Sequence, residues 1–459
     1  MSAVAVKRPR ASVAWFRDTL RWDVAFFQQI DWHWDDDLVH PAGSVIHRRR
    51  EEIDSKADCA SLPIIEKISF GGDISVTAPE DRIGYKGRLF WARPGDLVYS
   101  KIRVKQGSLA FVADGIGELA VSAEYPVYEI NTEIVDRRYL ALVFRSSPFM
   151  RLLEGLSHGG STKTRIPPEE FERQLIPLPP LPAQRKIVAV WEAAQKAVAA
   201  TMERVERLER ETKSRFLAEL GLEAPERSAA LKAFVVDWKN LERWGVQSNQ
   251  LAAAGVDPSK GEYPVAVGRD CLIEVKHGCS ASPSPVPSAL EVLKISAVTR
   301  GQFNPKEKKF AFDVPRYRQE FALRAGDVLM CRTNGTLALV GMSALVRKDL
   351  QDTIFPDKLI RVRCKPNILP AYFATLVKTR LVRSQIEAAA RTAVGNYAIG
   401  SEDIWALRFP LPPLNVQQKL MRRVEAGLVE VAELRKDVKA RGEAAKAQVE
   451  AMILGTKPV

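Results

Sequence analysis

The chain has 459 residues, of which 46% are hydrophobic, and a formal net charge of +12. This length allows two or three globular units, and the positive charge favours a polyanionic partner such as a nucleic acid. No apolar run approaches the roughly 20 residues of a membrane-spanning helix, the N-terminus lacks the apolar core of a secretory signal, and five cysteines without a CxxC pair argue against a disulfide framework or a structural zinc site. We therefore expect a protein of the reducing cytoplasm.

The first part of the chain, residues 1–180, reads as an α+β region. It starts with a lead, up to residue 60, to which the sequence assigns no role. The β-like runs RLFWA, DLVYSKIRV and SLAFVA follow, separated by Gly, Pro and Asp. A helical pattern of apolar residues then covers 137–156.

Residues 176–188, IPLPPLPAQRKIV, are predicted to join this region to a long helix. Pro177, Pro179 and Pro180 favour an extended backbone, whereas Pro182 can lie in the first turn of a helix. Apolar residues then recur with alternating steps of four and three, which is the pattern of a coiled-coil seam. The predicted seam positions are Ile187, Trp191, Ala194, Val198, Thr201, Val205, Leu208 and Thr212.

A second copy of this arrangement follows in residues 222–459. FPLPPLNVQQKLM at 409–421 is identical to 176–188 at seven of thirteen positions and lies 233 residues later. Weaker matches are collinear with it: RWDV and RWGV at an offset of 222, EKIS and LKIS at 227, RPGDLV and RAGDVL at 231, and LG twice at 234. These offsets predict a tandem duplication of one unit of about 230 residues.

The second copy also ends in a helix with a seam. Its predicted seam positions are Leu420, Val424, Gly427, Val431, Leu434 and Val438, followed by Ala445 and Met452. Asn415 is the predicted N-cap of this helix. Gln418, three residues later, is in the capping-box position from which a side chain can bond back to the N-cap amide. Because both seams lie in one chain, the simplest partner of each helix is the other, and pairing between chains is the alternative. The PLPPL runs have a second interpretation, as PxxP ligands of a recognition domain.

Motifs of catalysis are mostly missing. The sequence contains no GxxxxGK[ST] phosphate-binding loop and no Asn/Asp-Pro-Pro-aromatic loop of an amino-methyltransferase. The histidines His33, His40 and His47 are seven residues apart, too far for ligands in one helical turn. One nuclease candidate is DCLIEVK, in which Asp270, Glu274 and Lys276 could bind Mg²⁺ and activate water.

The chain resembles the specificity subunits of type I restriction-modification enzymes, the HsdS family. The resemblance is carried by Pro177–Lys186 and Pro410–Lys419, by the helices after them, by the paired GDL and GDV turns, and by the length. It covers essentially the whole chain. One departure is that Ala183 and Val416 replace the Glu often found before the Gln of the proline-rich segment.

The resemblance implies a tandem duplication of two α/β target recognition domains, each followed by a long helix, with the two helices paired as an antiparallel coiled coil. The corresponding regions are 1–180, 181–221, 222–410 and 411–459. It also implies a non-catalytic subunit that reads a bipartite sequence in double-stranded DNA and holds two methyltransferase subunits, with restriction subunits as further partners. S-adenosylmethionine, ATP and Mg²⁺ would then belong to those partners.

Two pairs of segments are candidates for contacting DNA, because each combines basic and polar side chains that suit phosphates and base edges. One pair precedes the proline-rich runs and the other follows the GD turns. The candidates are Ser161, Thr162, Lys163, Arg165, Arg391, Thr392, Asn396 and Tyr397 in the first pair, and Lys101, Arg103, Lys105, Arg332, Thr333 and Asn334 in the second.

Two other functions remain open from the sequence. The first is a coiled-coil adaptor that binds only proteins and shows no salt-dependent affinity for duplex DNA. The second is a self-sufficient nuclease that depends on Glu274.

Overall fold

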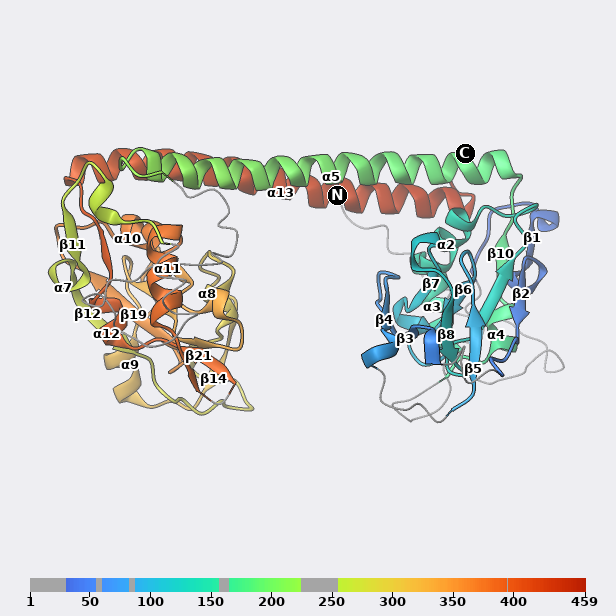
Figure 1. The fold of residues 1–459 in the computed structure, drawn as a ribbon, viewed down its shortest axis with the longest axis horizontal. Coiled ribbons are helices and arrows are strands. Elements are labelled where there is room, and N and C mark those ends of the chain that lie inside the picture. The colour runs from blue at the N-terminus through green and yellow to red at the C-terminus, as the bar shows by residue number, and fades with distance from the viewer. Residues whose placement is uncertain (1–29, 55–59, 82–86, 157–164, 224–254, 394) are drawn as a thin grey trace. The chain divides into compact units, whose positions relative to one another are not determined.

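The computed structural model describes residues 30–54, 60–81, 87–156, 165–223, 255–393 and 395–459. The chain forms two compact units: unit 1 comprises Met1–Thr201 and Lys436–Val459, and unit 2 comprises Met202–Arg435. Each unit holds a globular α/β domain and a stretch of each of two long helices (Figure 1). The domain boundaries predicted from the sequence stay predictions, because each unit combines segments from both halves of the chain.

Unit 1 is built on two four-stranded sheets, with the orders β2-β9-β6-β7 and β4-β3-β8-β5. Their strands are β2 (Ile46–Arg49), β3 (Ile64–Ile68), β4 (Ile74–Thr77), β5 (Leu89–Ala92), β6 (Leu97–Tyr99), β7 (Leu109–Phe111), β8 (Leu119–Ser122) and β9 (Val127–Ile130). Val98 of β6 and Val121 of β8 belong to one buried cluster, so the two sheets share a core. Leu97 and Tyr99 belong to a second cluster because alternate side chains of a strand point to opposite faces.

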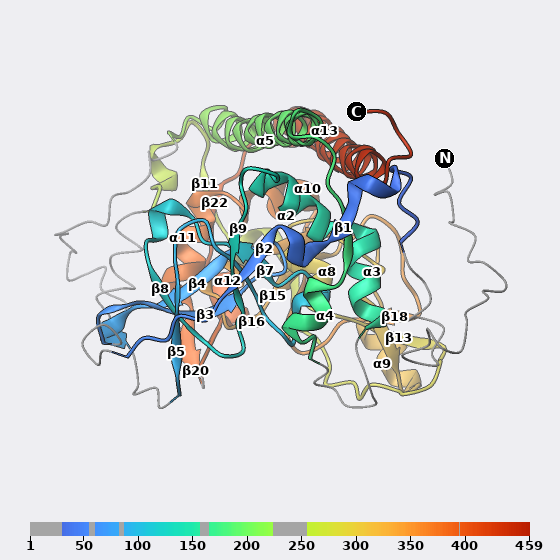
Figure 2. The same ribbon diagram turned by 90° about the vertical axis from the view of Figure 1, so that its right-hand side faces the viewer.

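Three helices of unit 1 pack on that second cluster: α2 (Arg137–Arg145), α3 (Ser147–Gly155) and α4 (Pro168–Glu172). Asp136 caps α2 by accepting a hydrogen bond from the Arg138 amide, and Ser146 caps α3 by accepting one from the Phe149 amide. Figures 1 and 2 show α2 between the strands of unit 1 and the long helices.

Unit 2 repeats this plan. Its main sheet has the order β12-β19-β15-β17, and a smaller sheet has the order β14-β13-β18. The strands are β12 (Leu272–His277), β13 (Leu290–Leu293), β14 (Lys308–Ala311), β15 (Val328–Cys331), β17 (Ser343–Leu345), β18 (Thr353–Ile354) and β19 (Leu359–Cys364). The helices are α7 (Gly268–Cys271), α8 (Ser296–Thr299), α9 (Pro315–Phe321), α10 (Pro370–Leu376), α11 (Arg380–Ala389) and α12 (Ser401–Trp405).

The proline-rich segments begin as short strands in both units. β10 (Leu175–Pro177) pairs with β1 (Val39–Pro41), and β22 (Arg408–Pro410) pairs with β11 (Val265–Val267). Equivalent tyrosines hold the ends of β10 and β22: the Tyr139 hydroxyl donates to the Pro177 carbonyl at 3.0 Å, and Tyr372 donates to Pro410 at 2.9 Å. Pro177, Pro179, Pro410 and Pro412 are buried. Their burial contradicts the interpretation of these runs as PxxP ligands.

A buried glutamine then fixes the start of each long helix. Gln184 donates from Nε2 to the carbonyls of Ile134 and Pro179, and its Oε1 accepts from the Asp136 amide at 2.8 Å. Gln417 makes the same three hydrogen bonds, to Asn367, Pro412 and the Leu369 amide, each partner lying 233 residues later in the chain. The duplication therefore extends to individual hydrogen bonds.

The two long helices, α5 (Leu181–Ala218) and α13 (Leu414–Leu454), lie side by side (Figures 1 and 2). Arg423 pairs with Glu219 at 2.5 Å and Arg435 with Glu209 at 2.8 Å, so residue numbers rise along one helix as they fall along the other. The predicted antiparallel coiled coil is confirmed. The predicted seam positions are buried or half-buried, and most of their neighbours are exposed.

Each domain core takes in one end of the coiled coil, formed by the start of one long helix and the end of the other. In unit 1, Ile187 and Val188 from the start of α5 join Val449, Met452 and Ile453 from the end of α13. In unit 2, the equivalent cluster contains Leu420 and Met421 from the start of α13 with Phe216, Leu217 and Leu220 from the end of α5.

The described part of the N-terminal lead belongs to the fold of unit 1. It supplies the strands β1 and β2, and the His33 amide donates to the carbonyl of Leu454 at 2.8 Å. The Trp34 indole N–H also donates to the carbonyl of Ile453 at 2.7 Å. These contacts hold the end of α13 against the domain.

Two local predictions are wrong. Helix α13 begins at Leu414, so Asn415 lies in its first turn and is not the N-cap. The helical pattern at 137–156 is two helices, α2 and α3, because Pro148 suits the first turn of a helix and Ser146 caps that turn.

Candidate nucleic-acid interface

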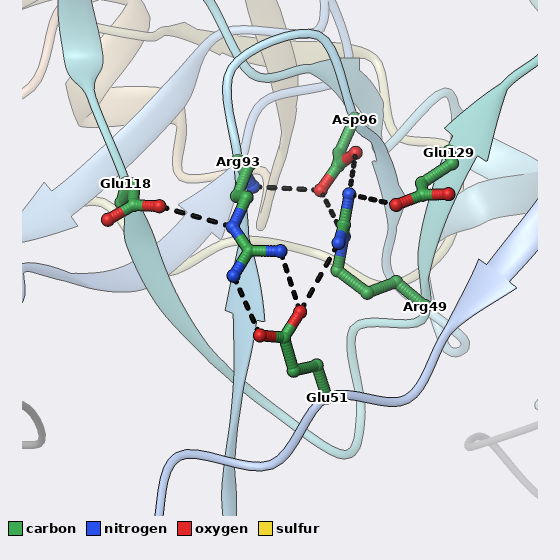
Figure 3. A network of polar contacts seen from close by, with 6 residues as sticks. All are labelled: Arg49, Glu51, Arg93, Asp96, Glu118 and Glu129. Carbon is green, nitrogen blue, oxygen red and sulfur yellow. Dashed lines mark hydrogen bonds and ion pairs between the residues drawn. The ribbon is translucent and has the colours of Figure 1, made fainter. Parts of the chain in front are cut away.

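The GD turn of unit 1 is held by a network of ion pairs (Figure 3). Gly95 has a φ of 86°, which lets Asp96 fold back to accept from the Arg93 amide at 2.8 Å. Arg49 of β2 donates to both carboxylate oxygens of Asp96, at 2.9 and 3.3 Å. Arg93 in turn donates to Glu51 at 2.6 and 2.7 Å and to Glu118 at 3.1 Å. The hydrogen bond from Arg93 is the main cause that lowers the pKa of Glu51.

The equivalent turn in unit 2 uses a different arginine. Asp327 accepts from the Arg324 amide at 2.8 Å, as Asp96 does from Arg93. Its carboxylate is held by Arg363 of β19, at 2.7 and 3.2 Å, and not by a residue of β12. In both units the turn fixes the start of the strand that leads to the candidate residues, β6 in unit 1 and β15 in unit 2.

In unit 1 the structure brings the candidates Lys101, Arg103, Lys105 and Arg165 together. Lys105 lies in the short helix η5 (Val104–Gln106), and Arg103 immediately before it is exposed. The Ile166 amide donates to the Lys101 carbonyl at 2.9 Å, which places Arg165 beside this segment. Arg165 pairs with Glu124 at 3.1 Å, and the Lys101 amide donates to the Glu124 carbonyl. Ser161, Thr162 and Lys163 lie outside the described residues.

In unit 2 the candidates form one small antiparallel sheet. Its order is β16-β21-β20, with β16 (Thr333–Asn334), β21 (Asn396–Ala398) and β20 (Arg391–Ala393). Tyr397 is paired with Asn334 on one side and with Thr392 on the other. Arg332 precedes this sheet, and its carbonyl accepts from the Ile399 amide at 3.0 Å, as Lys101 accepts from Ile166 in unit 1. Segments about 60 residues apart in sequence thus converge in both units.

The side chains of this small sheet differ in their availability to a ligand. Arg391 is exposed, with its guanidinium 3.6 Å from Asp403, and Thr392 and Asn396 are also exposed. Asn334 is half-buried, and its Oδ1 accepts from the Thr336 amide. Arg332 donates to the Asp357 carbonyl at 3.2 Å, and its charge adds to burial in lowering the pKa of His277. Arg391, Thr392 and Asn396 are therefore better placed for nucleic acid than Arg332 or Asn334.

Sequence reasoning missed one feature beside the unit 1 candidates, the turn between β3 and β4. Its residue Phe70 is 56% exposed. The string FGGD at 70–73 is a turn signal that marks the position, although not the exposure of the ring.

Two of the three proposed nuclease residues, Glu274 and Lys276, have structural partners. Glu274 accepts from the Arg361 Nε at 2.8 Å and also lies near Arg363. Asp270 is in α7, and Lys276 pairs with Glu320 at 3.6 Å. Within the described ranges, no cluster of three His, Cys, Asp or Glu side chains could hold a metal ion. Glu274 thus serves as the counter-charge of Arg361, which disfavours the nuclease hypothesis.

No helix in the described part of the chain is both long enough and apolar enough to cross a membrane.

Comparison with known proteins gives relatives of one kind, although no family model matches the chain. It is 27% identical over 288 residues to the type I restriction enzyme EcoKI specificity subunit of Escherichia coli K12, covering 62% of this chain and 57% of that subunit. It is 24% identical over 295 residues to the StySPI specificity subunit of Salmonella potsdam, covering 64% of this chain and 58% of that subunit. The chain thus spans less than three fifths of the length of these curated relatives.

The fold also has a solved counterpart. A chain from a structure of complex assembly and conformational transition in the type I R-M system matches with a TM-score of 0.54 and 16% identity. The match covers 90% of this chain and 96% of that one. The predicted resemblance to type I specificity subunits is confirmed by the sequence comparison, and the fold is shared with a chain of a type I R-M system.

Proposed function

We propose that this chain is the DNA-recognition subunit of a type I restriction-modification complex, with one half of a bipartite duplex sequence read by each unit. The observation that carries the proposal is the duplicated, glutamine-anchored junction between each α/β domain and the antiparallel coiled coil. Two related domains held by a shared coiled coil suit two separate half-sites, as in dimeric DNA readers. The specificity subunits that the chain resembles support the same assignment.

In this proposal the subunit recognises DNA and its partners carry out the chemistry. The methyltransferase subunits bring S-adenosylmethionine and transfer the methyl group to adenine, and restriction subunits bring ATP-driven cleavage. The exposed cations Arg103 and Arg391 contact phosphates or guanine edges, and Thr392 and Asn396 contact base edges.

The test is methylation mapping in cells that express the chain with its methyltransferase subunit. We expect adenine methylation at one asymmetric sequence made of two half-sites with a spacer. The double substitution Arg391→Ala and Thr392→Ala should relax the sequence at one half-site only and leave the other unchanged. Methylation of a single undivided site, or relaxation of both half-sites, would contradict the two-domain proposal. A complex without salt-dependent affinity for duplex DNA would favour the protein-only adaptor.

The coiled coil offers a surface for the methyltransferase subunits. On the part that belongs to unit 2, Met202, Leu428 and Val429 are exposed at 36%, 38% and 58%. Val429 lies on the side of α13 opposite its seam, and Met202 and Leu428 lie beside the seams of their helices. Exposed apolar side chains on paired helices are suited to a second apolar contact. We therefore propose that a methyltransferase subunit docks at these three residues.

Val429→Glu is expected to reduce co-purification of the methyltransferase subunit at least tenfold, since a charge would be buried on docking. The thermal unfolding midpoint should stay within about 1 °C of the wild type because the side chain is exposed. Ile273→Glu is the matched control, an apolar residue of unit 2 that is 63% exposed on β12, and it should leave co-purification unchanged. Full co-purification with the Val429 variant would refute this surface.

A further inference from the structure

The turn between β3 and β4 in unit 1 presents an aromatic side chain to solvent. Ser69, Phe70, Gly71, Gly72 and Asp73 form the turn, and Phe70 is 56% exposed at its tip. An isolated exposed phenylalanine is common on protein surfaces and by itself indicates nothing. Two properties of this turn distinguish it: it is tightly fixed, and it lies against the basic segment already considered for DNA.

The turn is fixed by hydrogen bonds and by a half-buried arginine. Asp73 accepts from the Ser69 hydroxyl at 2.8 Å, and the Ser69 carbonyl accepts from the Gly72 amide at 3.0 Å. Gly72 has a φ of 93°, and a Cβ there would collide with Nη2 of Arg145, which donates to the Leu109 carbonyl at 2.6 Å. Burial lowers the pKa of Arg145, and the nearby Asp73 carboxylate opposes the shift. The backbone that carries the exposed ring is therefore held in one place.

The turn packs directly on the segment that carries Arg103 and Lys105. The Ser108 hydroxyl donates to the Ile68 carbonyl at 2.8 Å, and the Ser108 amide donates to the Arg103 carbonyl. Gly107 has a φ of 99°, and a Cβ there would lie 2.5 Å from the Phe70 carbonyl oxygen. Lys67 on β3 and Arg103 are both exposed. The turn of Phe70 thus contacts the segment that carries cations suited to phosphates, and sites for nucleic acid combine basic and aromatic side chains in this way.

We propose that Phe70 contacts the bases of the half-site that unit 1 reads, as the apolar reading residue of that domain. This inference rests on the proposed DNA-recognition function. The ring can pack on a thymine methyl group at a base edge in the major groove, an apolar contact that carries sequence information and that a phosphate contact does not supply. The contact therefore contributes to sequence preference and not to general affinity for DNA.

The test uses the full-length chain co-purified with its methyltransferase subunit and a pool of duplexes of randomised sequence. The selected duplex and a scrambled duplex are then compared. Phe70→Ala should weaken binding to the selected duplex by about tenfold, leave the scrambled duplex unchanged and keep the salt slope. Arg103→Ala should weaken both duplexes and lower the salt slope by about one. Ile134→Ala, which removes an apolar side chain of unit 1 that is 47% exposed, should change neither.

Two outcomes would overturn the inference. One is a change of less than twofold for Phe70→Ala on the selected duplex, and the other is an equal loss on both duplexes. If the wild-type complex selects no sequence from the pool, the proposed function itself fails, so the two failures are distinguishable.

A second pair of variants tests whether the position of the ring matters. Gly72→Ala should reproduce the loss on the selected duplex, because alanine is strained at a φ of 93° and its Cβ would meet both Arg145 and, at 3.0 Å, the backbone carbonyl oxygen of Leu109, so the turn must shift. Gly71→Ala should not, since its Cβ would have only ordinary contacts, at 3.5 Å or more. Equal binding by both glycine variants and the wild type would contradict a fixed reading residue.

Discussion

Gln417→Ala is expected to destabilise unit 2 by about 3 kcal/mol or more. The substitution removes three hydrogen bonds from a buried amide and leaves the Leu369 amide and the carbonyls of Asn367 and Pro412 without this partner. A buried polar group without a partner costs about 1–3 kcal/mol, which is more than the net value of a typical hydrogen bond. The cost therefore comes mainly from the groups left behind.

The measurement is chemical denaturation of the full-length chain, monitored with a probe that reports on unit 2. Gln418→Ala is the matched control, because Gln418 is adjacent and exposed, and it should change the free energy of unfolding by less than about 0.5 kcal/mol. Gln417→Glu should be at least as harmful as alanine, because a carboxylate cannot donate to two carbonyls. A loss below about 1 kcal/mol for Gln417→Ala would show that the amide is not needed.

Gln184→Ala should have the same effect on unit 1, because Gln184 makes the equivalent three hydrogen bonds. In each unit the glutamine side-chain amide joins the proline-rich segment and the start of the long helix to the residues that precede a domain helix. That helix is α2 for Gln184 and α10 for Gln417. Loss of the amide should therefore loosen the junction between a domain and the coiled coil before it disturbs the sheets.

The sequence predicts the parts of this fold that follow local patterns. The 4–3 alternation from Ile187 to Thr212 identifies the buried side of α5, because helical periodicity places these residues on one face. The prolines of the two junctions and the collinear offsets identify the duplication. A GD turn is also predictable, since Gly95 and Gly326 supply the left-handed backbone that the turn requires.

Contacts between distant residues were not predictable in the same way. The repeated Gln184 and Gln417 are visible in the sequence, but their partners at Asp136 and Leu369 lie 48 residues earlier. The arginine that holds the GD aspartate comes from β2 in unit 1 and from β19 in unit 2, so no repeat pattern reveals it. The missed break between α2 and α3 shows that apolar periodicity can continue through a helix end.

The candidate site was predicted as separate segments, and its assembly depends on strand pairing. β20 and β21 form a hairpin with Gly395 at a φ of 74°, and β16 joins it from a different part of the chain. Burial then separates Arg391, which is exposed, from Arg332, which is tied to a carbonyl. Whether these residues contact DNA stays a prediction.

Glu274→Ala is expected to destabilise unit 2 by about 2–4 kcal/mol. Arg361 is only 2% exposed and lies over the ring of Phe355. Its Nη1 donates to the Ala322 carbonyl at 2.8 Å, and Glu274 supplies its carboxylate. Removing the carboxylate leaves a buried guanidinium with carbonyl partners alone, and breaking a buried ion pair from one side is costly. Part of the cost is relieved because the Glu274 side chain is 32% exposed, so water can approach.

The double variant Glu274→Met with Arg361→Met separates this explanation from catalysis. Removing both charges leaves no unpaired ion, so the double variant should recover most of the stability that the Glu274 variant loses. A catalytic carboxylate would behave differently, because its loss would abolish Mg²⁺-dependent cleavage while the fold stayed intact. Denaturation curves for the two variants, with a cleavage assay of the wild-type chain alone, measure both quantities. If the wild-type chain cleaves DNA and Glu274→Ala retains full stability, then Glu274 belongs to an active site and the counter-charge explanation is wrong.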